Sequence, residues 1–342
     1  MKGKVSIGII GAGRIGRLHA RHLRRRIEAA EVIAVSDINT AAAVDCSAEL
    51  GIPQSYRDYR DVLHNPDIDA VVICSSTDTH AEIIAEAAAA GKHIFCEKPI
   101  ALNLAAIDSA LQAVDEAGVK LQIGFNRRFD SEYRRIWEHL RAGTIGEPHL
   151  IHVISRDPAP PPIEYVKVSG GIFLDMMIHD FDMLRYLIGA EVEELHALGD
   201  VRVDPKIGAA GDVDTALVSV RFTNGVIGSI DNSRRAVYGY DQRVEVFGSG
   251  GMLRNENEAP NSVEVSTAQE ISFDLPLNFF MDRYVNSYIA EMEAFIEAVL
   301  EDRPTSVTGR DGKIPVIMGM AAGKSLREKR PVRLEEIAPM PE

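Results

Sequence analysis

Near its N-terminus the chain reads Val5-Ser6-Ile7-Gly8-Ile9-Ile10-Gly11-Ala12-Gly13-Arg14-Ile15-Gly16, a short apolar run that leads into a glycine-rich turn. The run predicts a buried strand, and a helical pattern follows the turn. In this GxGxxG pattern, Gly11 permits a tight turn, Gly13 lets the backbone approach a pyrophosphate, and Gly16 lets the helix pack on the strand. The stretch therefore predicts a dinucleotide site at a helix N-terminus, and a glycine-rich turn without a ligand is the alternative.

Strand-like runs alternate with helical patterns over the first 125 residues. The runs cover residues 5–10, 32–36, 70–74, 93–96 and 121–125, and the clearest helical patterns cover 79–90 and 104–117. Gly91 and Gly118 follow those two helices, where glycine commonly ends a helix. This alternation predicts a Rossmann domain over residues 1–125, with a doubly wound parallel sheet.

The rhythm changes after residue 125. A helix over 130–142, a strand over 149–156 and a proline-rich loop over 157–163 come first. Strand-like runs separated by turn residues then cover 194–203, 216–222, 226–232, 242–247 and 262–267, and helices over 283–300 and 309–327 end the chain. This order predicts a second domain over residues 126–342, of the α+β class with a mostly antiparallel open sheet. The whole chain is thus expected to be an α/β protein of two domains.

Composition narrows the class of protein. The 342 residues carry a formal net charge of −14, which argues against nucleic acid and anionic membranes as partners. The three cysteines, Cys46, Cys74 and Cys96, have neither metal-ligand spacing nor the density of a disulfide framework. We therefore expect no metal site, reduced thiols and a cytoplasmic location. No signal peptide or membrane span is apparent.

Further residues complete the predicted cofactor site. Asp37 ends the second strand about 20 residues after Gly16, where a carboxylate binds the adenosine hydroxyls and repels a 2′-phosphate. This position favours NAD over NADP, although Arg14 could meet a phosphate. Because ligands of open α/β sheets bind at the carboxyl ends of strands, the residues after two further strands are also candidates. These candidates are Ile15 in the turn, Ser76, Thr77, Glu97, Lys98 and His80, of which His80 could equally have only a packing role.

A second stretch concentrates titratable groups in an apolar setting. Residues 170–187 read as one helix that is apolar almost all round, and such a helix should be buried. Asp175, His179 and Asp182 stand at i, i+4 and i+7, on one face of it. Unpaired buried charge is costly, so three such groups favour a catalytic role over a polar network that only fixes packing.

Several motifs resemble the glucose–fructose oxidoreductase/inositol dehydrogenase family, most closely its inositol 2-dehydrogenases. The resemblance covers nearly the whole chain and rests on Glu97-Lys98-Pro99 after the Rossmann pattern and on segments 125–130, 155–161, 170–186, 238–248 and 279–284. It implies NAD-dependent oxidation of myo-inositol at carbon 2 to scyllo-inosose, by an enzyme that is a homotetramer joined through the outer face of the second-domain sheet. By the same resemblance Lys98, Asp175 and His179 are the catalytic residues, and Arg127, Asp157, Asp182 and Tyr238 bind the cyclic polyol together with Asp175 and His179.

The chemistry of these side chains agrees with the resemblance. An imidazole, whose ordinary pKa is about 6.5, suits His179 to accept the hydroxyl proton. Asp175 can orient that ring, and Lys98 can donate to the substrate oxygen. Three alternatives remain open at this stage: the same reaction on scyllo-inositol or a pyranose sugar, a non-catalytic NAD-binding regulator, and redox-neutral chemistry with transient oxidation by NAD.

Overall fold

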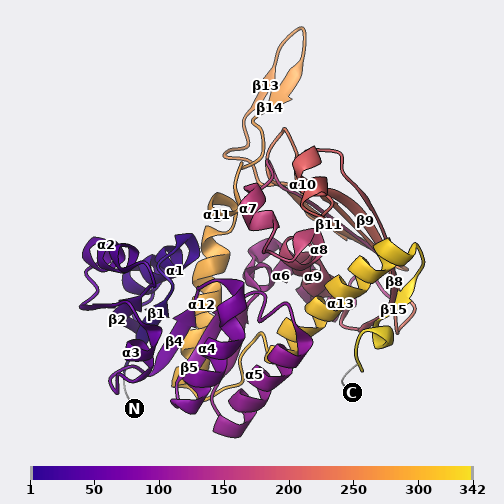
Figure 1. The fold of residues 1–342 in the computed structure, drawn as a ribbon. Helices are drawn as coiled ribbons and strands as arrows, with labels where there is room; N and C mark the ends of the chain where they lie inside the picture. The colour runs from indigo at the N-terminus through magenta and orange to yellow at the C-terminus, as the bar shows by residue number, and fades with distance from the viewer. Residues whose placement is uncertain (1–2, 340–342) are drawn as a thin grey trace. The chain divides into compact units, whose positions relative to one another are not determined.

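The computed structural model describes residues 3–339 and divides the chain into two compact units. Unit 1 comprises residues 1–129 and 286–314, and unit 2 comprises residues 130–285 and 315–342. Figure 1 shows the order of the elements along the chain. No helix within the described range is long and apolar enough to cross a lipid bilayer.

Unit 1 is built on a parallel sheet of six strands in the order β3-β2-β1-β4-β5-β6. The strands are β1 (Val5–Ile10), β2 (Ala30–Ser36), β3 (Gln54–Tyr56), β4 (Ala70–Ile73), β5 (His93–Glu97) and β6 (Leu121–Gly124). The helices between and after them are α1 (Arg14–Arg25), α2 (Thr40–Leu50), α3 (Tyr59–Leu63), α4 (Thr77–Ala89), α5 (Leu104–Ala117) and the 3-10 helix η1 (Asn126–Phe129). The predicted doubly wound sheet is confirmed. Of its six strands, the short β3 was the one that the sequence pattern did not predict.

The three glycines between β1 and α1 meet different surroundings. Gly11 has φ of +98°, and a Cβ at Gly16 would lie 1.8 Å from the carbonyl oxygen of Gly11. The turn therefore cannot close with a side chain at Gly16. Gly13 has an extended backbone, with φ of −71° and ψ of −168°, and a Cβ there would meet no protein atom within 4 Å. The fold itself does not require glycine at this position, which leaves room for another molecule to approach the backbone.

The helix α12 (Val285–Leu300) returns the chain to unit 1. Its Met292, Phe295 and Ile296 are buried in one cluster with residues of β1, β2 and α1. The units therefore differ from the division predicted at residue 125, because a segment far along the sequence completes the core of the first sheet. Its apolar pattern indicated a helix but carried no information about which sheet it covers.

Unit 2 contains a mixed sheet of seven strands in the order β12-β11-β7-β10-β9-β8-β15. Only β10 and β7 pair in parallel, so the expected mostly antiparallel sheet is confirmed. The strands are β7 (Pro148–Arg156), β8 (Val192–Asp200), β9 (Thr215–Phe222), β10 (Ile227–Ser233), β11 (Asp241–Gly248), β12 (Gly251–Arg254) and β15 (Val332–Arg333). The helices are α6 (Ser131–Arg141), α7 (Ile163–Val166), α8 (Gly171–Asp175), α9 (Ile178–Ile188), α10 (Pro205–Ala209), α11 (Phe280–Arg283) and α13 (Gly309–Glu328), which begins in unit 1; η2 (Leu334–Glu336) is a 3-10 helix.

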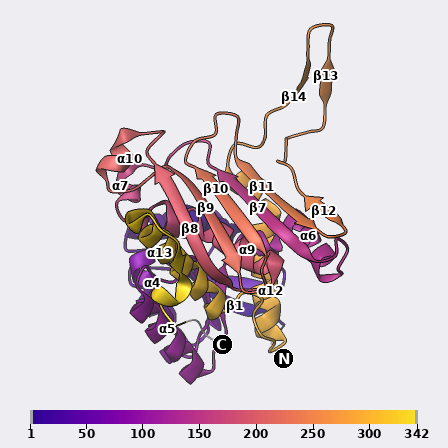
Figure 2. The same cartoon turned by 90° about the vertical axis from the view of Figure 1, so that its right-hand side faces the viewer.

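The two faces of this sheet differ in burial. Along β9 and β10 buried residues alternate with half-buried or exposed ones, as expected for a sheet covered on one side. Figure 2 shows the uncovered face, and it exposes Leu150, Leu198, Leu217, Ile227, Phe247 and Met252. The strand register leaves two apolar groups on the surface of unit 2: Leu198 lies beside Leu217, and Ile227, Leu150, Phe247 and Met252 follow one another across four strands.

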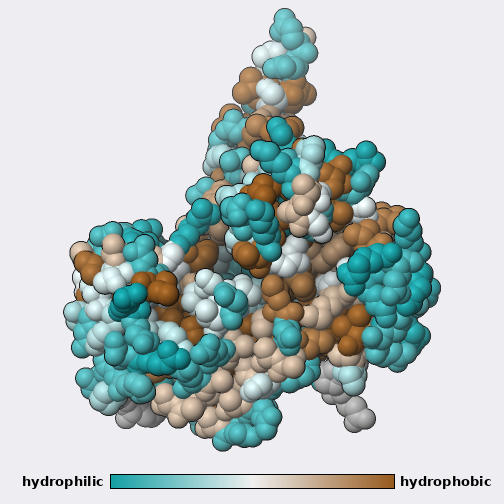
Figure 3. Space-filling model, in the orientation of Figure 1, coloured by the Kyte–Doolittle hydropathy of each residue, from teal (hydrophilic) through white to brown (hydrophobic). Residues whose placement is uncertain are grey.

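The strand predicted over residues 262–267 does not join the seven-stranded sheet. It forms a separate hairpin of β13 (Glu264–Ser266) and β14 (Ile271–Phe273) that extends away from the sheet. Figure 3 shows apolar side chains on this hairpin, and Ile271, Phe273 and Leu275 are each more than 60% exposed. The sequence alternation was correct for a strand, but it could not tell which strand would be the partner.

The glycine turn yields a prediction that separates its structural glycine from its binding glycine. Gly16→Ala should lower the free energy of unfolding by about 1–3 kcal/mol or more, because the added methyl overlaps a fixed carbonyl. Gly13→Ala should leave the melting temperature unchanged and weaken NAD binding, because its methyl occupies the space left for the pyrophosphate. Thermal unfolding and NAD titration of both variants check this. Equal loss of stability in the two variants would contradict it.

Candidate active site

Asp37 is fixed beside the glycine turn. Its Oδ2 accepts a hydrogen bond from the Ala12 backbone N–H at 2.7 Å, and its Oδ1 accepts one from the Asn39 N–H at 2.8 Å. The carboxylate is thus held at the end of β2 with further lone pairs available for ribose hydroxyls. Arg14 is exposed and Ile15 half-buried at the start of α1. Together with the open space at Gly13, these residues fit the adenosine and pyrophosphate of NAD.

Two of the predicted cofactor residues stand where the chain passes from β4 to α4: Ser76 precedes the helix and Thr77 is its first residue. Ser76 is the N-terminal cap residue of α4 and its side chain makes no capping hydrogen bond. His80 lies in the same helix and is buried. Its Nδ1 lies 2.8 Å from the carbonyl oxygen of Pro99, and its Nε2 lies 3.1 Å from that of Ser75. Burial lowers the pKa of His80. The ring therefore joins the ends of two strands, which favours the packing role that the sequence left open.

Glu97 and Lys98 follow one another at the end of β5, and both are half-buried. The Oε1 atom of Glu97 lies 2.7 Å from Nε2 of His19, a buried residue of α1. Sequence reasoning missed His19, although it stands in the helix that the glycine turn begins. Glu97 and Lys98 therefore lie at the carboxyl ends of the strands of the first sheet, as do the glycine turn and Asp37.

The predicted helix over residues 170–187 is wrong as a single element. The structure divides it into α8 and α9, with Met176 and Met177 between them. The Met177 N–H donates to the carbonyl of Ile172, five residues back, and the Asp180 N–H donates to Met177, three residues back. The regular helical hydrogen bonding between each N–H and the carbonyl four residues back is therefore interrupted here, as at a π-bulge. Asp175 ends α8 while His179 and Asp182 belong to α9, so the three do not form one straight stripe.

The surroundings of Asp175 were largely invisible in the sequence. The Tyr165 hydroxyl donates to its Oδ1 at 2.8 Å, and Nη1 of Arg234 lies 3.4 Å from its Oδ2. Arg234 is 1% exposed, and its Nη2 lies 3.6 Å from a carboxylate oxygen of Asp212. Burial, and then the Asp175 carboxylate, raise the pKa of Tyr165, so its hydroxyl stays a donor. Asp175 is thus held by a neutral donor and a buried cation.

The remaining acids of this segment are more deeply buried than Asp175. Asp180 and Asp182 have no exposed surface, and the Asn232 side-chain amide donates to Asp180 at 2.8 Å. His179 stands in the first turn of α9 and is half-buried. Two sets of polar contacts therefore lie inside unit 2, one around Asp175 and one between Asn232 of β10 and Asp180 of α9. Tyr165, Arg234 and Asp212 carried no local sequence signal, because only the tertiary structure brings them near Asp175.

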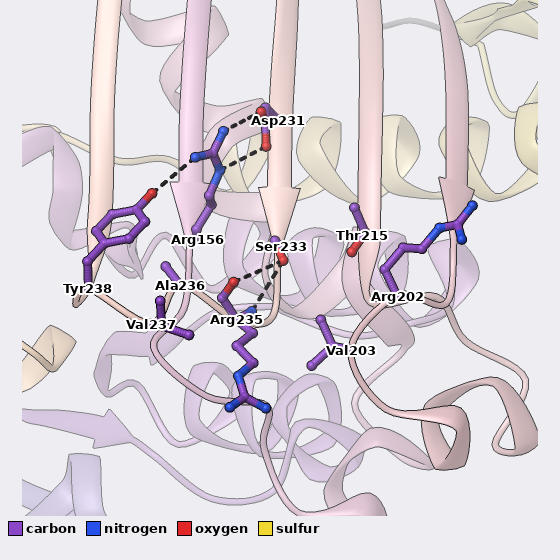
Figure 4. Close-up of a pocket in the computed structure, with 10 residues that line it drawn as sticks. All are labelled: Arg156, Arg202, Val203, Thr215, Asp231, Ser233, Arg235, Ala236, Val237 and Tyr238. Atoms are coloured by element: carbon purple, nitrogen blue, oxygen red, sulfur yellow. Dashed lines mark hydrogen bonds and ion pairs between the residues drawn. The ribbon is translucent and has the colours of Figure 1, made fainter.

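The other predicted polyol contacts belong to different elements of the chain. Arg127 is buried in η1 of unit 1, and Asp157 follows β7, where its backbone carbonyl accepts from the Ala236 N–H at 2.6 Å. The Tyr238 hydroxyl donates to Asp241 at 2.5 Å and lies 3.1 Å from Nη1 of Arg156. Figure 4 shows Tyr238 directed toward Arg156 beside a pocket of about 650 Å³. The hydrogen-bonding partners of the Tyr238 hydroxyl are thus Arg156 and Asp241, not the catalytic candidates.

Comparisons with known proteins agree with both parts of the chain. Residues 5–125 match the model of the oxidoreductase family with an NAD-binding Rossmann fold, and residues 133–254 match the model of the GFO/IDH/MocA C-terminal domain. A myo-inositol 2-dehydrogenase from Thermotoga maritima is 50% identical over 97% of this chain and 99% of its own length.

Solved structures give the same result. A scyllo-inositol dehydrogenase from Lactobacillus casei with bound NAD(H) and scyllo-inositol has a TM-score of 0.91 at 32% identity, over 97% of this chain and 99% of that one. A myo-inositol dehydrogenase from Lactobacillus casei in complex with NAD(H) and myo-inositol has a TM-score of 0.88 at 28% identity, over 96% of both chains. From the glycine turn to the second-domain sheet, this chain is an oxidoreductase with an NAD-binding Rossmann fold and belongs to the GFO/IDH/MocA family.

Proposed function

We propose that this protein oxidises myo-inositol at carbon 2 to scyllo-inosose with NAD, a reaction that would serve inositol catabolism. The observation that carries the proposal is the Asp175 carboxylate, held by Tyr165 and the buried Arg234 just before His179. The names of full-length relatives support the substrate class. The presence of Lys98, Asp175 and His179 together disfavours a non-catalytic NAD-binding regulator.

His179 is proposed as the general base. Oxidation of an alcohol requires that the hydroxyl proton leave as the C–H bond breaks, and a neutral imidazole can accept it. Asp175 orients the imidazole and stabilises the imidazolium that forms. The donors on Asp175, Tyr165 and Arg234, keep this carboxylate fixed so that it need not rearrange during the reaction.

Lys98 is proposed to donate a hydrogen bond to the oxygen that becomes the carbonyl. Its ammonium would stabilise the alkoxide character that develops there. NAD, when bound at the glycine turn and Asp37, supplies the hydride acceptor. We further propose that Arg127, Asp157 and Asp182 hold the other ring hydroxyls by hydrogen bonds. Tyr238 stays a prediction, since Arg156 and Asp241 already engage its hydroxyl.

The substrate is tested by NADH formation across inositol isomers and common sugars. We expect myo-inositol to give the highest kcat/KM, and NAD to be preferred over NADP because of Asp37. The competing candidate is scyllo-inositol, which one structural relative binds. A higher kcat/KM with scyllo-inositol than with myo-inositol would show that scyllo-inositol is the preferred substrate. Turnover without net NADH release would indicate redox-neutral chemistry.

We propose a homotetramer joined through the uncovered face of the seven-stranded sheet, located in the cytoplasm. Contiguous exposed apolar side chains usually mark an interaction surface. Leu198, Leu217 and Ile227 are 46–58% exposed on this face. The free thiols of Cys46, Cys74 and Cys96 fit a reducing compartment.

Leu217→Glu should dissociate the tetramer, because it places a charge in the proposed apolar interface. Val44→Glu, on exposed α2 in unit 1, is the matched control and should remain tetrameric. Sedimentation velocity checks both variants. A monomeric unmodified protein, or a Leu217→Glu protein that assembles fully, would contradict the proposed interface.

Lys98→Ala should lower kcat by about a hundredfold or more while NAD binding stays nearly unchanged, because one donor to a developing oxyanion is lost. Single-turnover kinetics and NAD titration measure the two effects separately. Near-normal turnover would place Lys98 outside the chemistry.

His179→Ala should lower kcat by about 10²–10⁴-fold, and Asp175→Asn should cost less, since it removes only the orienting partner. In the unmodified protein the oxidation rate should rise with pH as the imidazole loses its proton. Melting temperatures measured on the same variants separate chemistry from folding. A His179→Ala protein with full activity, or one that loses stability alone, would refute the assignment.

A further inference from the structure

A cluster of three titratable groups lies in unit 1, and the mechanism above uses none of its buried members. It consists of His19 from α1, Glu97 from β5 and Glu291 from α12. His19 and Glu291 have no exposed surface, while the Glu97 side chain is 15% exposed. The hydrogen-bonding side-chain atoms of the three all lie within 4.8 Å of one another.

The distances within the cluster are unequal. Nε2 of His19 lies 2.7 Å from Oε1 of Glu97, a hydrogen bond, but 4.0 Å from Oε1 of Glu291. Among residues 3–339, no side chain or backbone group forms a hydrogen bond with either carboxylate oxygen of Glu291. A buried carboxylate without hydrogen bonds is strongly unfavourable, whereas a neutral carboxylic acid is much less so. Burial, and then the nearby Glu97, raise the pKa of Glu291 well above its ordinary value.

We propose that His19 and Glu291 are positioning residues that fix one negative charge on Glu97, with Glu291 present as a neutral acid. An ionised Glu291 would repel Glu97 and compete with it for the His19 N–H. The neutral acid leaves that hydrogen bond to Glu97 alone. The inference rests on the proposed function in one respect, which is that Glu97 lies beside the nicotinamide ring of NAD.

Other contacts also restrict Glu97 and His19. A Cβ at Gly124 would lie 3.0 Å from Oε2 of Glu97, so the neighbouring strand leaves space for this carboxylate. The His19 ring packs edge-on against Phe95 and Tyr288, with centroids 5.3 and 5.6 Å apart. The Cys74 thiol faces the same acids, and burial raises its pKa well above the ordinary value, so it adds no charge. Glu97 is therefore the one member of the cluster placed to carry negative charge toward solvent.

A fixed negative charge at Glu97 should favour NAD⁺, whose nicotinamide ring is positive, over NADH, whose ring is neutral. The ratio of the dissociation constants for NADH and NAD⁺ measures this preference without turnover. Glu97→Gln and His19→Phe should each lower the ratio by roughly two- to fivefold, as for a partly screened charge pair. His19→Phe keeps an aromatic ring between Phe95 and Tyr288, so the fold should persist. Glu291→Gln should leave the ratio unchanged.

The protonation state of Glu291 is tested by stability against pH. A carboxyl whose pKa is raised in the folded state binds a proton that the unfolded state has lost. The stability of the unmodified protein should therefore fall, relative to Glu291→Gln, as pH rises above the ordinary carboxyl pKa. Glu293→Gln, an exposed position on the same helix, is the control and should follow the unmodified protein at every pH.

Two results would overturn the assignment of Glu291 as a neutral acid. One is a stability of the unmodified protein that rises relative to Glu291→Gln as pH rises, which would show that the charged form is favoured in the folded state. The other is stabilisation of the unmodified protein by added Zn²⁺ that Glu291→Gln abolishes, which would make the three residues a metal site. An unchanged NADH to NAD⁺ ratio in both Glu97→Gln and His19→Phe would refute the positioning role, even if NADH formation from inositol confirmed the proposed function.

Discussion

The closure of the glycine turn is the constraint on which unit 1 depends. A side chain at Gly16 would overlap the Gly11 carbonyl, so α1 can pack this closely against the end of β1 only because residue 16 is glycine. The seated helix directs its N-terminal N–H groups to the space beside Gly13 and brings His19 within 2.7 Å of Glu97. One local close approach thus sets both the phosphate-binding backbone and the buried contact behind the proposed nicotinamide site.

Unit 2 solves a different problem, which is how to hold carboxyl groups in fixed positions beside an apolar segment. The buried Arg234 lies between Asp175 and Asp212, and its guanidinium faces both half-buried carboxyl groups. The interruption at Met176 and Met177 matters here, because it separates the acid that ends α8 from the imidazole that begins α9. Rigid acids and a half-buried imidazole are what the proposed base chemistry requires.

The fold could be predicted where local patterns decide it. Alternation placed the strands and helices of the first sheet, and the turn-rich runs gave the mostly antiparallel second sheet. The sequence pattern could not predict which elements pack or pair with one another when they are far apart in the chain. The return of α12 to the first core and the separate pairing of β13 with β14 depend on packing that no local pattern records. Asp175 and His179 were predicted as site residues from their spacing, whereas Arg234, Tyr165 and Glu291 became visible only through their contacts.

The central claim is that hydride leaves carbon 2 of myo-inositol for NAD, and isotope transfer tests it most directly. Myo-inositol that carries deuterium at carbon 2 is incubated with NAD and the protein, and the nicotinamide product is examined by NMR. The account predicts one deuterium at the carbon of the reduced ring that accepts hydride, together with scyllo-inosose. Reduced cofactor without deuterium, or inositol that exchanges its label without net reduction of NAD, would contradict it.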